Sequence, residues 1–147
     1  MEVTVAKSAG FCFGVKRAID TVYQEIEKGE QVFTLGPIIH NEQVVQELAD
    51  KGVRVIHSLE ELADIKEGTV VIRSHGVSEK VIRQLEKYDI KIVDATCPFV
   101  SKIHRIVQEK YREGYRIVII GSRTHPEVEG INGWGEDSAA VLETVDE

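Results

Sequence analysis

The chain has 147 residues, of which 42% are hydrophobic and 29% are charged, a balance typical of a globular protein with a buried core. Its 25 acidic and 18 basic residues give a formal charge of -7, which disfavours nucleic acid and anionic membranes as partners. No apolar run approaches the ~20 residues that span a bilayer, and the N-terminal segment lacks the apolar centre of a signal peptide. We therefore expect a cytoplasmic protein, whose two cysteines are buried, catalytic or metal-binding rather than joined in a disulfide scaffold.

Short β-rich runs alternate with amphipathic helical patterns along the chain. The β-rich runs predict strands at residues 3–5, 32–35, 53–56, 70–72, 90–93, 117–120 and 139–142. Apolar residues at helical spacing predict helices between these strands, around residues 15–26, 44–48, 79–88 and 100–107. This alternation predicts an α/β protein, built from repeated units of mostly parallel sheet flanked by helices.

The sequence contains an internal repeat with a period of 85 residues. Four distinctive pairs coincide under this shift: Cys12 with Cys97, Gly36 with Gly121, His40 with His125, and Glu42 with Glu127. Each cysteine therefore precedes its histidine by 28 residues, in the order strand, Cys, helix, strand, Gly-x-x-x-His-x-Glu. Similarity at a fixed period indicates a duplicated α/β unit.

The two copies of this unit differ in length. Residues 1–95 form the first predicted unit, and residues 96–147 form the start of the second. Glu147 corresponds to Leu62 of the first copy, which continues beyond that point with a further strand and a further helix. A parallel unit that ends there leaves an unpaired sheet edge, so the sequence predicts one complete unit and a truncated second unit of a longer protein.

The two cysteines each come just before a predicted helix, in the runs GFCFG (residues 10–14) and DATCP (residues 94–98). A thiol at a helix N-terminus meets free backbone N–H groups and the positive end of the helix dipole, which favour the metal-binding thiolate. The chain lacks the Cys-x-x-Cys spacing of a zinc site. The alternative is that Cys12 and Cys97 are small buried packing residues.

Three histidines also follow predicted strands: His40 in the run HNE, His75 in RSHGV and His125 in HPEVEG. In open parallel sheets, ligands bind beyond the carboxyl ends of the strands, so these side chains are candidates to bind an anion such as diphosphate. The alternative for each is an ordinary loop histidine. Glu127 lies in a first helical turn, where it either complements the helix dipole or carries protons beside His125. His57 and His104 lack this context, and we assign them no function.

Together, these motifs resemble the 4-hydroxy-3-methylbut-2-enyl diphosphate reductase family, iron–sulfur enzymes of isoprenoid precursor synthesis. The matching runs occur in family order across nearly the whole chain: GFCFGV (10–15), IHN (39–41), SHGV (74–77), DATCP (94–98) and HPEVEG (125–130). The resemblance implies a cloverleaf of three similar α/β units around a 4Fe–4S cluster, with one cysteine ligand from each unit. Cys12 and Cys97 match the first two ligands, and the sequence has no third cysteine.

The resemblance also implies an activity, the removal of the substrate hydroxyl as water by two electrons and protons. The products would be isopentenyl and dimethylallyl diphosphate of the methylerythritol phosphate route, and the electrons would come from a ferredoxin- or flavodoxin-type donor. His40, His75 and His125 match the family's diphosphate-binding histidines. Glu127 matches its proton-delivery residue and, with His125, forms the predicted catalytic pair.

The missing third cysteine leads us to expect that this chain alone holds no intact cluster and does not turn over. Two other hypotheses stay open at this stage. One is a non-catalytic module that binds diphosphate without a cluster. The other is a thiol–disulfide redox protein, which requires the Cα atoms of Cys12 and Cys97 to lie within about 7 Å.

Overall fold

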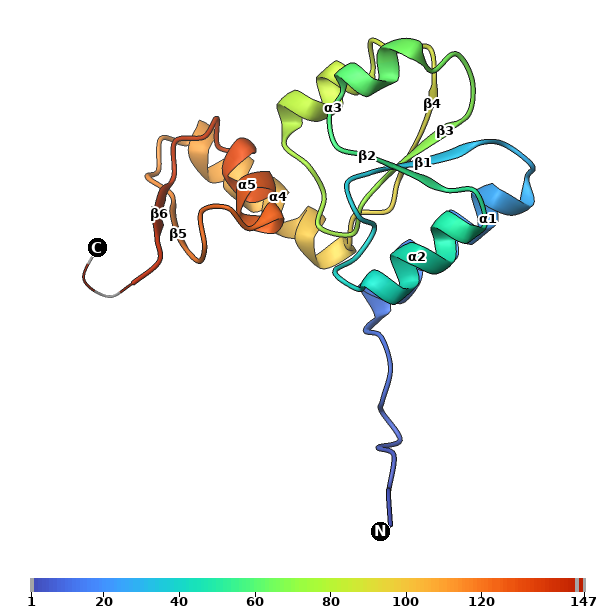
Figure 1. Ribbon diagram of the computed structural model, residues 1–147. Coiled ribbons are helices and arrows are strands. Elements are labelled where there is room, and N and C mark those ends of the chain that lie inside the picture. Colours follow the sequence, from blue (N-terminus) through green and yellow to red (C-terminus); the bar gives the residue numbers. More distant parts are fainter. Residues whose placement is uncertain (1, 145, 147) are drawn as a thin grey trace.

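The structure, a computed structural model, describes residues 2–144 and 146. Its elements follow in the order α1 (Phe13–Glu27), β1 (Val32–Leu35), α2 (Glu42–Asp50), β2 (Arg54–Ile56), the 3-10 helix η1 (Glu60–Asp64), β3 (Thr69–Ile72), α3 (Glu79–Leu85), β4 (Lys91–Asp94), α4 (Pro98–Arg112), β5 (Val118–Ile120), α5 (Pro126–Gly133) and β6 (Ala140–Leu142). The predicted α/β class is therefore confirmed (Figure 1). Among the described residues, no helix is long and apolar enough to cross a membrane.

The first sheet has the strand order β2-β1-β3-β4, and every neighbouring pair of strands is parallel. Its register places Leu35 beside Ile72, and Ile72 beside Asp94. The carboxyl ends of β1, β3 and β4 therefore lie side by side at one edge of the sheet. The loops that leave this edge carry His40, His75 and Cys97.

Both central strands, β1 and β3, are buried at every position, because helices cover both faces of the sheet (Figure 1). Side chains alternate across β3, so Val71 packs against α1 and α2 on one face, while Val70 and Ile72 pack against η1 and α3 on the other. Removing one such buried side chain from water contributes about 1.5–3 kcal/mol. This two-sided core fixes the sheet edge from which the candidate site projects.

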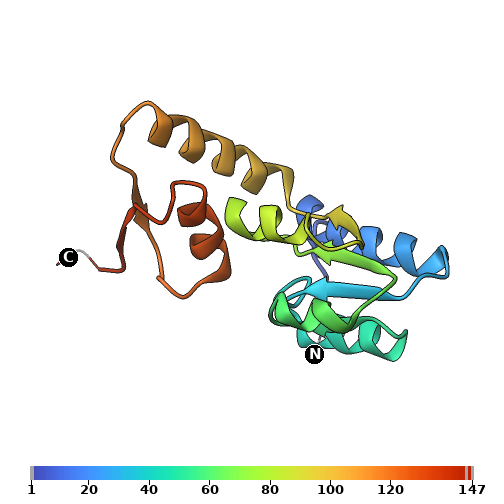
Figure 2. The same ribbon diagram turned by 90° about the horizontal axis from the view of Figure 1, so that it is seen from above.

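The second part of the chain begins with α4, which runs away from the first sheet with α5 beside it (Figure 2). Strands β5 and β6 form a separate parallel pair. Two apolar residues of β5 stay exposed, Val118 at 58% and Ile120 at 85%. The described residues thus bury the two central strands of the first sheet and leave this second pair of strands open. The division of the chain at residues 95 and 96 stays a prediction.

The predicted strand at residues 3–5 is wrong. These residues adopt no regular structure, and Val3 and Val5 are 75% and 76% exposed. The N-terminal segment runs away from the body of the protein, where no described strand lies beside it (Figure 1). An apolar run forms a strand only when a neighbour supplies the hydrogen bonds of the ladder, so its composition alone misled the prediction. The other six predicted strands are present within one residue of their predicted bounds.

Candidate functional site: three imidazoles beside two helix-start thiols

The three predicted histidines lie in one cluster. The ring centroids are 4.4 Å apart between His40 and His75, 5.5 Å between His40 and His125, and 6.0 Å between His75 and His125. The three rings come from the β1–α2 loop, the β3–α3 loop and the residue that caps α5. Segments distant in sequence therefore converge on one point, and the role of these rings in binding stays a prediction.

Backbone hydrogen bonds hold the loops of this cluster together. The N–H of Ser74 donates to the carbonyl oxygen of Ile38 at 3.2 Å, which ties the His75 loop to the His40 loop. The N–H of Cys97 donates to the carbonyl oxygen of Ser74 at 2.9 Å, which ties the start of α4 to the same loop. Asn41 fixes the start of α2, since its side chain accepts from the N–H of Val44 at 3.0 Å. The site is therefore continuous with the sheet edge.

His125 is the N-cap of α5, and its Nδ1 accepts a hydrogen bond from the backbone N–H of Glu127 at 3.2 Å. A neutral imidazole that accepts at Nδ1 carries its proton on Nε2. The Nε2–H of His125 is thereby free to donate to an anion. Glu127 itself is half-buried in the first turn of α5, as the sequence predicted.

The electrostatics of the cluster favour an anionic ligand. Burial, followed by the positive charges of His40, Arg73 and His125, lowers the pKa of His75 to about 4. The Nδ1 of His75 and the Nε of Arg73 are buried without a hydrogen-bond partner among the described residues. Burial also lowers the pKa of Arg73, against a raising effect of Glu129. An anionic ligand would give these buried nitrogens hydrogen-bond partners beside the Arg73 guanidinium.

Arg73 was not predicted as a site residue. Its guanidinium lies over Gly36, where an added Cβ would be 2.6 Å from Nη1. Gly36 has a φ of 72°, so the chain turns here at the end of β1 and leaves room for the arginine. A sequence signal existed, because Arg73 lies two residues before His75 at the same strand end.

The two cysteines are the N-caps of α1 and α4, as predicted, and Pro98 occupies the first turn of α4. Neither side chain makes a capping hydrogen bond. An added Cβ at Gly14 would lie 2.5 Å from the Sγ of Cys97, so this thiol packs directly against the first turn of α1. Arg17 fastens the same contact, because its Nη1 donates to the carbonyl oxygen of Thr96 at 2.9 Å. The two helix starts therefore lie together.

The thiols fit a metal cluster only in part. Cys12 and Cys97 are both free, and Cys12 is exposed. Within the part of the chain that the structure describes, no group of three or more His, Cys, Asp or Glu side chains is arranged to hold a metal ion. Two helix-start thiols have the chemistry that iron–sulfur clusters require of their ligands. They would supply two ligands at most, and further ligands would have to come from elsewhere.

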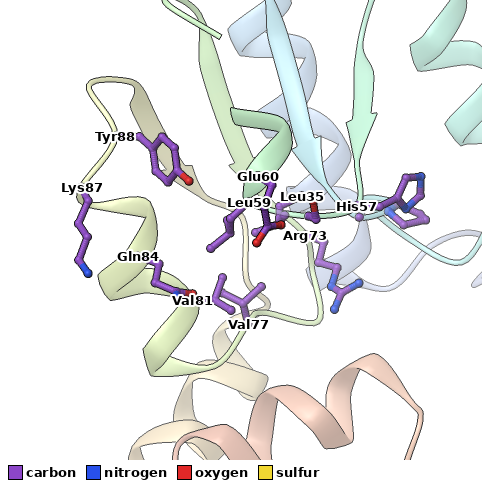
Figure 3. Close-up of a pocket in the computed structure, with 13 residues that line it drawn as sticks. Leu35, His57, Leu59, Glu60, Arg73, Val77, Val81, Gln84, Lys87 and Tyr88 are labelled. Carbon is purple, nitrogen blue, oxygen red and sulfur yellow. The ribbon is translucent and has the colours of Figure 1, made fainter. Parts of the chain in front are cut away.

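A separate cavity of about 580 Å³ lies between η1 and α3. Figure 3 shows Arg73 and Val77 at the lower side of the cavity, and Tyr88 and Lys87 on its left side. The three clustered histidines are not among its lining residues, whereas His57 is. The lining of the cavity combines the carboxyl group of Glu60 with the cationic side chains of Arg73 and Lys87, so it does not favour one sign of charge in a ligand. The chemistry of the histidine cluster therefore defines the candidate site better than this hollow does.

An α/β sheet edge that carries a histidine cluster beside two thiols defines a class of protein, a candidate anion-binding redox protein. The sequence pattern of the LytB protein family matches residues 3–147. The chain therefore belongs to the LytB protein family.

Relatives agree with this membership. The chain is 53% identical over 150 residues to a 4-hydroxy-3-methylbut-2-enyl diphosphate reductase of Thermoanaerobacter sp. (strain X514), covering 100% of this chain and 52% of that protein. It is 44% identical over 148 residues to the protein of that name from Clostridioides difficile (strain 630), with the same coverage. The chain thus spans about half the length of the curated relatives it matches.

Two solved structures resemble this fold. The E-1-hydroxy-2-methyl-but-2-enyl-4-diphosphate reductase from Plasmodium falciparum superposes with a TM-score of 0.88 and 32% identity, over 95% of this chain and 44% of that one. An (E)-4-hydroxy-3-methyl-but-2-enyl diphosphate reductase, described as the terminal enzyme of the non-mevalonate pathway, gives 0.81 and 42%, over 98% and 52%.

Proposed function

We propose that this chain supplies the diphosphate-binding histidines and two of the cysteine ligands of a 4-hydroxy-3-methylbut-2-enyl diphosphate reductase. One observation carries the proposal. Three imidazoles from three separate loops lie with ring centroids within 6.0 Å of one another, and one of these loops is hydrogen-bonded to the residue that bears a helix-start thiol. An anion site and a metal-ligand pair at one sheet edge are what the reduction of a diphosphate substrate requires.

The histidines would bind the diphosphate group. His125 donates through Nε2–H, and the buried Nδ1 of His75 lacks a partner among the described residues, so both have hydrogen-bonding capacity left for phosphate oxygens. Because the pKa of His75 is about 4, this ring is neutral near pH 7 in the free protein. Bound diphosphate would offset the repulsion from the neighbouring cations and raise that pKa.

Glu127 would carry a proton to the reacting end of the substrate. The overall change is R–OH + 2 electrons + 2 protons → R–H + water, so the site must deliver protons as well as electrons. Glu127 is half-buried, and its backbone holds His125 in place. We assign proton transfer to this carboxyl group, which belongs to the first turn of α5, two residues after His125.

A 4Fe–4S cluster, when bound, would supply the two electrons one at a time. Cys12 and Cys97 are the residues of this chain that would hold it. A ferredoxin- or flavodoxin-type protein would supply electrons to the cluster. We place the reaction in the cytoplasm, at the end of the non-mevalonate (methylerythritol phosphate) route.

The test is a reductase assay on the complete gene product, under anaerobic conditions with a one-electron chemical reductant. We expect 4-hydroxy-3-methylbut-2-enyl diphosphate to give isopentenyl and dimethylallyl diphosphate. Unchanged substrate, from protein with a full complement of iron, would refute the proposal.

A second candidate is a diphosphate-binding module without a cluster. The observation in its favour is that the described residues form the imidazole cluster completely but contain only two thiols. The two candidates separate in the iron content and turnover of the unmodified gene product, with a Cys12→Ala/Cys97→Ala double variant as the check that binding needs no thiol. Pyrophosphate binding that survives in this variant, together with no iron and no turnover in the unmodified protein, would favour the module.

A further inference from the structure

A buried contact joins α4, α5 and the β3–α3 loop behind the histidine cluster. At its centre is His104 of α4, which is only 4% exposed, although the sequence analysis assigned it no function. Its ring stacks on Trp134 at the end of α5, with centroids 5.3 Å apart and planes 19° from parallel. Figure 2 shows α5 lying beside α4 and close to α3, so the contact bridges the first sheet and the second part of the chain.

Two glycines make room for the His104 ring. At Gly76, where φ is 70°, an added Cβ would lie 2.6 Å from the Cε1 of His104. At Gly130 of α5, an added Cβ would lie 3.7 Å from the Nε2 of His104 and 3.6 Å from the carbonyl oxygen of His75. The imidazole of His104 therefore lies in contact with the backbone that bears His75 on one side and with α5 on the other.

Trp134 completes the contact from α5. Its Nε1–H donates to the carbonyl oxygen of Val77 at 2.9 Å. Next to it, an added Cβ at Gly133 would collide with Ser78, so α5 packs tightly on the loop before α3. One end of α5 is thus fastened to the His75 loop, while His125 caps the other end.

From this geometry we propose that His104 is a positioning residue that sets the spacing between His75 and His125, and with it the width of the anion site. His75 lies in the loop after β3 and His125 caps α5. The His104 side chain packs against that loop at Gly76 and against α5 at Gly130. The inference rests on the proposed function only for the identity of the ligand as a diphosphate.

The role is one of shape rather than charge. Burial lowers the pKa of His104 to about 4 against a raising effect of Asp94, so the ring is neutral near pH 7. Its Nε2 is buried and has no hydrogen-bond partner among the described residues, so no polar contact at this atom orients the ring. The stacking on Trp134 and the space left by the two glycines orient it instead.

The experiment compares His104→Ala with His57→Ala in the complete gene product. His57 is exposed and lies outside the contact, so it is the matched control. In His104→Ala, we expect a weaker NMR cross-peak between the His75 and His125 rings. We also expect pyrophosphate binding, by calorimetry, to weaken of the order of tenfold, as when a residue that orients a ligand is lost. In His57→Ala, both should stay unchanged.

A double-mutant cycle separates positioning from general destabilisation. In a His75→Ala background, His104→Ala should no longer weaken pyrophosphate binding, because the residue that it positions is gone. If His104→Ala does not fold, Trp134→Phe replaces it, since this variant keeps an aromatic ring but loses the bond to Val77; the same changes are expected, smaller in size.

An unchanged ring–ring cross-peak in a folded variant, or an equal loss of binding in both backgrounds, would overturn the inference. Failure of the proposed function gives a different result. The cross-peak would still depend on His104, while the unmodified protein would leave the diphosphate substrate unreduced.

Discussion

The loop after β3 and the segment before α1 carry site residues under opposite conditions. Around His75, Ser74 is 5% exposed and Val77 is 6% exposed, and hydrogen bonds reach this loop from Cys97 and Trp134. Around Cys12, all of residues 2–13 are exposed. The described residues therefore enclose the loop that carries His75, whereas they leave the segment that carries Cys12 open. Metal binding and anion binding should therefore respond to different substitutions.

The largest effect on iron content and turnover is expected from Cys97→Ser. This change removes a sulfur ligand, the Cys97 Sγ that packs against α1, so the complete gene product should lose its iron and with it all turnover. Pyrophosphate binding should remain, because the imidazoles do not depend on the metal. Iron analysis and calorimetry on the same sample check both parts. An unaltered iron content would remove Cys97 from the ligands.

The next effect is expected from Glu127→Gln. Losing the proton donor should reduce turnover by about 10²–10⁴-fold, the usual contribution of a positioned acid. The visible absorbance of the cluster should survive, since the change keeps the size of the side chain. Glu86→Gln, which changes an exposed carboxyl group at the C-terminal end of α3, is the matched control for the steady-state assay. Full activity of Glu127→Gln would exclude the proposed role.

A smaller effect is expected from His40→Ala, the counterpart of the cysteine variant. It should weaken pyrophosphate binding about 10- to 100-fold, as expected when a hydrogen bond to a charged group is lost. The iron content should stay the same. A KM that does not change in the reductase assay would contradict the assignment of His40 to the diphosphate.

Much of this comparison was visible in the sequence. The rule that ligands bind at the carboxyl ends of parallel strands placed His40, His75 and His125 near one another, and the rings are in contact range. The apolar runs predicted β1 to the residue and β3 to within one residue, because strands buried on both faces are near-continuous apolar runs.

The parts that the sequence did not predict depend on partners distant in the chain. The run at residues 3–5 has strand composition but no described neighbour to pair with. His104 was assigned no function from the sequence, although it lies at helical spacing between the buried Val100 and Val107. That position on the apolar face of α4 was the available signal.

The last prediction concerns how the free energy of unfolding depends on pH. The folded-state pKa of His75 and that of His104 are both lowered from 6.5 to about 4, so the unfolded chain binds protons more readily between these values. The contribution of these two histidines to the free energy of unfolding is therefore fully present above about pH 6.5 and falls as the pH drops towards 4. Each histidine contributes a slope of at most about 1.4 kcal/mol per pH unit. Urea unfolding at several pH values should show that the free energy of unfolding depends less steeply on pH in His104→Gln. In His57→Ala this dependence on pH should be unchanged.

The most direct measurement is an NMR titration of the five histidine rings with pyrophosphate. The account predicts that the signals of His40, His75 and His125 shift together with one dissociation constant, while those of His57 and His104 shift far less. Signals that do not move at all, or a shift centred on His57, would contradict a diphosphate site at the three imidazoles.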